Sequence, residues 1–80
     1  MTTTELKLVK KIGASAFCVY EYIKQFPTAK TVEMEDKLGI SSKTIVSVLK
    51  KLQDNKIIAR RRKDFLTREI EVLPQESWGV

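Results

Sequence analysis

The hydrophobic period of this sequence changes once, and that change limits which elements the chain can form. Up to residue 54, apolar residues recur every three or four positions, which is the spacing of helices with one buried face. From residue 57 onward, a β-branched run is followed by alternation with charged residues, which is the spacing of strands. The sequence therefore predicts an α+β fold, mostly α, with three helices followed by a C-terminal two-stranded β-hairpin.

The first helix is expected over residues 14–26, begun at Ala14 or capped by Ser15. Pro27 ends it, because the residue before a proline is displaced from the helical conformation. The inward stripe of this helix follows the i, i+3, i+4, i+7 spacing and consists of Ala16, Val19, Tyr20, Ile23 and Phe26.

Two further periodic segments are expected to be helices over residues 31–38 and 42–54. Thr31 is the expected N-cap of the first, and Gly39 supplies a left-handed turn at its end. Ser41 is the expected N-cap of the second. The inward stripe of that helix consists of Ile45, Val48, Leu49 and Leu52.

The N-terminal extension, residues 1–12, fits two secondary structures. Apolar residues at positions 6, 9 and 12 favour a helix, whereas those at positions 6 and 8 favour a short strand. Both alternatives stay open, and Gly13 is expected to end the segment. All 80 residues are expected to form a single domain.

The hairpin is expected over residues 57–73, with its turn at residues 64–66. Its first strand opens on β-branched residues, and the second alternates so that Ile70 and Val72 share one face. The tail, residues 74–80, is expected to be loose apart from Trp78.

The stretch from Thr31 to Ile45 resembles the helix-turn-helix of bacterial, archaeal and phage regulators, in which a Leu-Gly-Ile-Ser turn introduces the recognition helix. The continuation over residues 48–58 looks like the end of that helix entering a wing. The resemblance covers residues 14–73 and implies a three-helix winged helix-turn-helix fold, with 42–54 as the recognition helix and the hairpin as the wing.

Two residues depart from the pattern of that family. Glu35 stands where such motifs usually place an alanine that permits close approach of the helices. Lys56 stands where a glycine commonly precedes the wing, and Asn55 is expected to take the left-handed conformation in its place.

A DNA-binding surface follows from the side of helix 42–54 that lies opposite its apolar stripe. Serine and lysine can bond base edges or phosphates, Val46 can meet a thymine methyl group, and the helix start can bind phosphate. The candidate residues on this helix are Ser41, Ser42, Lys43, Thr44, Val46, Ser47, Lys50 and Lys51. On the wing they are Arg60, Arg61, Arg62 and Lys63, which are expected to contact the DNA backbone.

Charge is concentrated in the same part of the chain. The chain has 15 Lys and Arg against 10 Asp and Glu, a net charge of +5. Residues 43–63 hold eight basic side chains and one acidic, whereas residues 64–80 hold one basic and four acidic. This distribution favours an anionic partner. Cross-strand pairing with Glu69 and Glu71 is the competing explanation for the arginine run.

The function predicted from these features is sequence-specific binding of double-stranded DNA, as a transcriptional regulator. A homodimer is expected, because two-fold proteins bind paired half-sites, with residues 4–12 and the aromatic stripe of helix 14–26 as its interface. Two alternatives stay open. Residues 15–20 resemble the helix start of phage and plasmid replication proteins, which suggests their DNA-binding domain. The third possibility is a winged-helix module that binds only protein.

Composition argues against other classes of function. The chain has no histidine, so it lacks His-based acid–base pairs and His-containing zinc sites, and its three glycines are too scattered for a phosphate loop. We therefore expect no enzyme, no metal, no cofactor and no small-molecule ligand. Cys18 is expected to be a buried thiol. No apolar run approaches a membrane span, and the expected location is the cytoplasm, nucleoid-associated or in a host cell.

Overall fold

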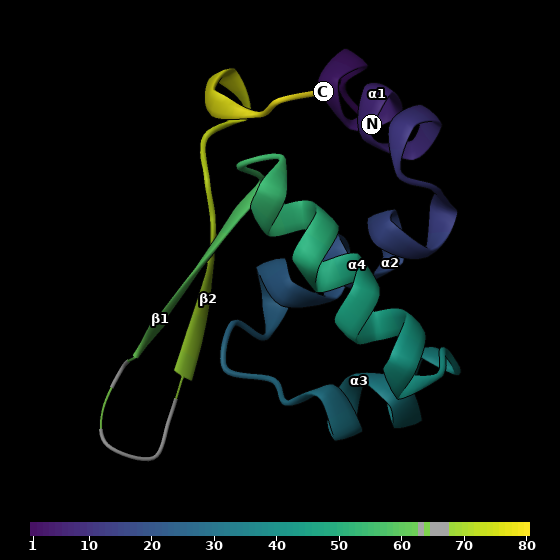
Figure 1. The fold of residues 1–80 in the computed structure, drawn as a ribbon, viewed down its shortest axis with the longest axis vertical. Helices are drawn as coiled ribbons and strands as arrows, with labels where there is room; N and C mark the ends of the chain where they lie inside the picture. The colour runs from purple at the N-terminus through teal and green to yellow at the C-terminus, as the bar shows by residue number, and fades with distance from the viewer. Residues whose placement is uncertain (63, 65–67) are drawn as a thin grey trace.

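The computed structural model describes residues 1–62, 64 and 68–80, and it has the mostly helical α+β composition that the sequence predicts. Figure 1 shows α4 lying across the other helices and the hairpin extending away from them. The elements in chain order are α1 (Thr3–Lys11), α2 (Ala14–Gln25), α3 (Thr31–Leu38), α4 (Ser42–Asp54), β1 (Ile58–Arg62), β2 (Arg68–Val72) and the short 3-10 helix η1 (Gln75–Ser77).

Helix α1 is the fourth helix, one more than the sequence predicted, and it settles the open question about residues 1–12. A capping box begins it: the Thr2 side chain accepts from the backbone N–H of Glu5, and the Glu5 carboxylate accepts from the backbone N–H of Thr2. Leu8 faces inward and is fully buried. Gly13, with a φ of 125° that favours glycine, joins α1 to α2.

Helix α2 buries the predicted stripe as far as Ile23. Two predictions about this segment are wrong. Phe26 lies beyond the helix and is 48% exposed, with its ring tilted by 40° against that of Tyr22 and the ring centroids 4.8 Å apart. Cys18 is exposed, because it falls two positions before Tyr20 and therefore on the far side of the helix.

The bounds of α3 and α4 coincide with those that the apolar spacing predicts. Gly39 ends α3 with a φ of 67° in the left-handed region. Ser41 caps α4, as expected, but Thr31 does not cap α3: the N-cap is Lys30, which makes no side-chain cap, and Thr31 is the first helical residue. Glu35 is exposed, so it does not stand between the two helices.

The hairpin pairs β1 with β2 in antiparallel register, from Ile58 opposite Val72 to Arg62 opposite Arg68. The free edge of β2 is held to the loop between α2 and α3, since the backbone N–H of Ile70 donates to the Pro27 carbonyl oxygen at 2.8 Å. Where α4 meets β1, the left-handed residue is Lys56 itself, with a φ of 59°. Asn55, which was expected there, has a φ of −92°.

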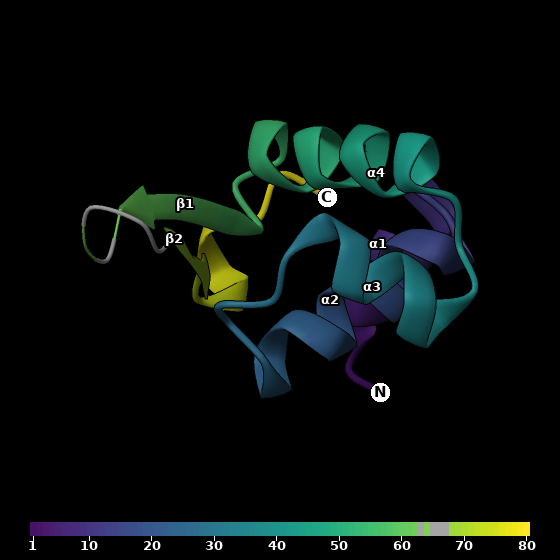
Figure 2. The same cartoon turned by 90° about the horizontal axis from the view of Figure 1, so that it is seen from below.

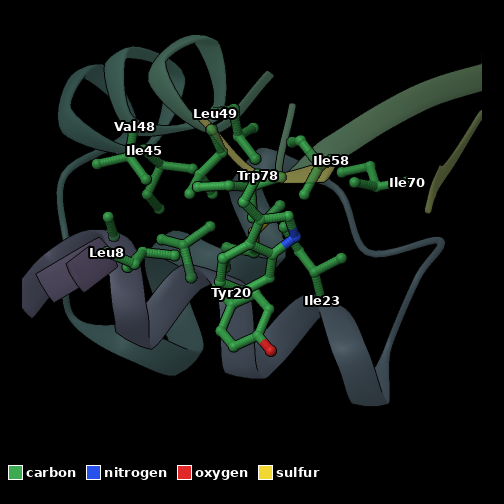
Figure 3. Close-up of a cluster of buried hydrophobic side chains, with 14 residues drawn as sticks. Leu8, Tyr20, Ile23, Ile45, Val48, Leu49, Ile58, Ile70 and Trp78 are labelled. Carbon is green, nitrogen blue, oxygen red and sulfur yellow. The ribbon is translucent and has the colours of Figure 1, made fainter. Parts of the chain in front are cut away.

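One hydrophobic core joins all four helices, the hairpin and the tail (Figure 3). The prediction of a loose tail is wrong, because residues 75–77 form η1 and the Gly79 backbone N–H donates to the Asn55 carbonyl oxygen at 2.7 Å. Trp78, the expected exception, is 8% exposed and packs edge-on against Tyr20, with ring centroids 5.2 Å apart. Its indole N–H donates to the Leu73 carbonyl oxygen at 2.9 Å. A buried tryptophan removes enough apolar area from water to order a short segment.

Candidate nucleic-acid interface

The surface of α4 that faces away from the core is polar and cationic. Its inward stripe is buried as predicted: Ile45, Val48, Leu49 and Leu52. On the opposite side, Lys43, Ser47 and Lys50 follow one another at i, i+4 and i+7, and all three are exposed. Val46 lies beside them and is 54% exposed. The helix thus presents two ammonium groups, a hydroxyl and an aliphatic side chain to solvent.

At the start of α4, two of the candidate hydroxyl groups already have partners. The Ser41 hydroxyl donates to Thr44 Oγ1 at 2.9 Å and accepts from the Thr44 backbone N–H at 3.3 Å. Ser42 is exposed at the first helical position. Because Ser41 and Thr44 complete the N-cap, their first role is to fix where the helix begins.

The charge of α4 is not uniform along its length. Asp54, which was not predicted to belong to this surface, continues the line of Lys43, Ser47 and Lys50 at i+11 and is exposed. It gives the C-terminal end of that line a negative charge. Lys51 lies on the flank that carries Val48, away from the flank of Leu49. The cationic part of the outward line is therefore its first two to three turns.

The arginines of the hairpin divide between its two faces. Alternation along β1 places Arg60 and Arg62 on one face and Arg61 on the other. Arg61 Nη2 lies 2.7 Å from Glu71 Oε2 across the strands, so the cross-strand pairing considered for this run occurs at Arg61. Lys63 lies outside the described residues, as does most of the expected turn.

Two cations that sequence reasoning missed lie next to this surface. Arg68 on β2 stands directly opposite Arg62, and Lys30 precedes α3. Within the described part of the chain, neither has an ion-pair partner. The pairing register brings Arg68 to the same face as Arg60 and Arg62, so alternation together with a known register would have predicted it. No local signal marks Lys30.

The groups with perturbed pKa values lie on α1 and α2, away from the arginine face. The backbone N–H of Thr2 and the Tyr20 hydroxyl hold the pKa of buried Glu5 below its ordinary value, although burial opposes them. The Glu33 carboxylate, which accepts from the Tyr22 hydroxyl, raises the pKa of Tyr22 to about 12. Both pairs tie elements together rather than expose a reactive group.

The expected dimer interface is only partly available. The aromatic stripe of α2 is used by the core, with Val19, Tyr20 and Ile23 at most 2% exposed. This part of the prediction is wrong. On α1, Leu8 is also buried, whereas Leu6 is 47% exposed.

No family model matches this chain, and no curated protein matches it. Among the described residues there is no helix long and apolar enough to cross a membrane. The same part of the chain holds no group of three or more Cys, Asp or Glu that could ligate a metal ion.

Proposed function

We propose that this chain is a winged helix-turn-helix protein that binds double-stranded DNA without catalysing a reaction. Helix α4 lies in the major groove, which is wide enough to admit a helix, and the hairpin follows the flanking backbone as a wing. Arg60, Arg62 and Arg68 contact phosphates, while Lys43, Ser47 and Lys50 face the base edges.

The observation that carries this proposal is that two neighbouring elements, α4 and the hairpin, both expose cations that form no ion pair within the described part of the chain. The arginine face of the hairpin and the α4 residue Leu49 line the same cavity, so the two elements border one another. Figure 2 shows the hairpin extending beyond the helices at the C-terminal end of α4. A duplex lying along α4 would reach such an extension with its sugar–phosphate backbone.

We also propose that the protein acts in the cytoplasm as a sequence-specific transcriptional regulator and as a homodimer. One module of this size contacts few base pairs, and two copies related by a two-fold axis would bind paired half-sites. Occupancy of its site by the dimer would then be the regulatory act.

The test is a fluorescence-anisotropy titration of random-sequence duplex over a series of salt concentrations. The affinity should fall with a log–log slope of about −2.7, because each of the three phosphates neutralised by Arg60, Arg62 and Arg68 contributes about −0.9. Arg62→Gln should make the slope shallower by about 0.9, because it removes one phosphate contact. Arg61→Gln, the same charge change on the other face, should leave it nearly unchanged. A protein-binding module that never contacts nucleic acid would show no binding at low salt.

A further inference from the structure

A cavity of about 320 Å³ lies where the start of α3, the middle of α4 and the hairpin meet. Its inner wall is apolar, made of Met34 from α3, Leu49 from α4 and Ile70 from β2, which belong to the core cluster. The cavity size is at the lower end of the range in which small-molecule sites fall. Three separate elements therefore form one concave, largely apolar site.

The rim of this cavity is cationic. Lys30, Arg60 and Arg68 line it, together with the hydroxyl-bearing Thr28 and Thr31. Among the described residues that line the cavity there is no carboxylate, and none of the three cations forms an ion pair. The adjoining cross-strand pair, Arg62 opposite Arg68, brings like charges together, which destabilises a hairpin unless an anion lies near them.

We propose that this cavity binds a small organic anion with an apolar body, such as an aromatic or medium-chain carboxylate. The carboxylate would be held by Arg60 and Arg68, whose guanidinium groups suit bidentate pairing with it. The apolar body would lie against Met34, Leu49 and Ile70, where the ligand removes its own apolar surface from water. The amphipathic lining favours this ligand over inorganic phosphate, which would use the rim alone.

This site goes beyond the proposed DNA binding and does not depend on it. One consequence does depend on it: a ligand that occupies Arg60 and Arg68 takes them from the DNA backbone, so ligand and duplex would compete. Because the ligand also bridges α4 and the hairpin, its binding would act on the two elements proposed to contact DNA.

The experiment is a titration of the full chain with 2-naphthoate in the absence of DNA, in which ¹H–¹⁵N correlation spectra are recorded at each ligand concentration. Saturable shifts are expected at the backbone amides of Ala29, Thr31, Leu49 and Ile70, with a dissociation constant on the order of 0.1–1 mM, given the size of the probe. Arg60→Gln and Arg68→Gln should each weaken binding at least about fivefold, since each removes half of the proposed clamp. Arg61→Gln carries the same charge change on the opposite face and should bind as the wild type does.

Two further probes, 2-naphthamide and inorganic phosphate, test separately whether binding needs the carboxylate and whether it needs the apolar body. The neutral analogue 2-naphthamide should bind at least about tenfold more weakly, because it leaves the arginines without an anion. Equal binding of naphthoate and naphthamide, equal loss in all three arginine variants, or no saturable shifts would each overturn the proposal. Inorganic phosphate that shifts the same amides as tightly as naphthoate would also overturn it, because the apolar wall would then play no part. None of these outcomes bears on duplex binding, which is measured separately.

Discussion

Lys56 carries a local backbone strain that a single substitution can relieve. Its φ of 59° lies in the left-handed region, where a side chain with a Cβ costs about 1–2 kcal/mol. Glycine removes that cost but gives the unfolded chain more freedom, which offsets roughly 0.4–1 kcal/mol. We therefore expect Lys56→Gly to raise the free energy of unfolding by about 0.5–1 kcal/mol, measured by urea denaturation. Lys56→Ala removes the same charge and keeps the Cβ, so a gain of equal size in that variant would contradict the explanation.

Tyr20 and Glu5 form a buried hydrogen bond whose contribution depends on pH. The Tyr20 hydroxyl donates to Glu5 Oε2 at 2.8 Å, and Tyr20 is 2% exposed. Tyr20→Phe should lower the free energy of unfolding at pH 7 by about 1 kcal/mol, the usual net value of such a bond. Tyr22→Phe is the matched control, because its hydroxyl bonds Glu33 at the surface and should matter much less.

The direction of the pH effect follows from the lowered pKa of Glu5. A carboxylate whose folded pKa lies below its ordinary value of 4.5 stabilises the fold above that pH and loses the contribution as the pH falls through the folded pKa. Removing the Tyr20 hydroxyl brings the folded pKa closer to the ordinary value. The difference between wild type and Tyr20→Phe should thus narrow as the pH falls below 4.5. A difference that stays constant down to acid pH would show that lost packing, not the carboxylate, is responsible.

Among the elements, α4 and the hairpin should contribute different properties to DNA binding. Side chains that face base edges discriminate between sequences, whereas those that contact phosphates bind every duplex alike. Lys43→Ala and Ser47→Ala should therefore each reduce the difference in binding free energy between the specific and the random duplex, by roughly 1–3 kcal/mol for a lost base contact. Arg62→Ala should weaken both affinities equally. The measurement is a competition titration with the duplex selected from a random pool. Loss of specificity in Arg62→Ala alone would mean that the hairpin, not α4, contacts the bases.

The elements differ in how far the sequence could predict them. Helices α3 and α4 combine a strong apolar period with a defined turn between them, and their bounds were predicted. Helix α1 is short, and its apolar residues fit two periods, so only its capping box distinguishes helix from strand. Local pattern favoured Asn55 for the left-handed conformation, but the bonds that close α4, from the Lys56 N–H to the Gln53 carbonyl oxygen and from the Ile57 N–H to the Leu52 carbonyl oxygen, place Lys56 there.

The site was predictable to the extent that it lies on one element. The outward side of α4 follows from its inward stripe, and every candidate residue on it is exposed. Alternation alone separates Arg61 from Arg60 and Arg62, but only the register shows that Arg68 stands opposite Arg62 on the arginine face. Lys30 and the cavity depend on three elements meeting in space, which no sequence period encodes.

At the scale of the molecule, the two ends of the chain hold each other in place. The Thr2 hydroxyl donates to Gln75 Oε1 at 3.0 Å, and Lys11 Nζ donates to the Gly79 carbonyl oxygen at 2.6 Å. Trp78 lies between them on Tyr20. A chain of this size buries a modest fraction of its surface, so the tail adds a needed part of the core. This packing also leaves α1 at the edge of the molecule with one side toward solvent.

That exposed side of α1 is where we expect the proposed homodimer to form. Leu6 is 47% exposed and half-buried Val9 lies one turn further, so a two-fold axis across α1 would bring two Leu6 side chains together. Leu6→Lys should convert a dimer at tens of micromolar to a monomer, because it places like charges across the axis. The variant should stay folded, because the Leu6 side chain is already exposed. Sedimentation equilibrium measures both states. Val32→Lys is the matched control, because Val32 is an exposed aliphatic residue on α3 and should leave the dimer intact. A monomeric wild type at these concentrations, or equal dissociation of the two variants, would rule out α1 as the interface and with it the paired half-sites that the dimer was proposed to bind.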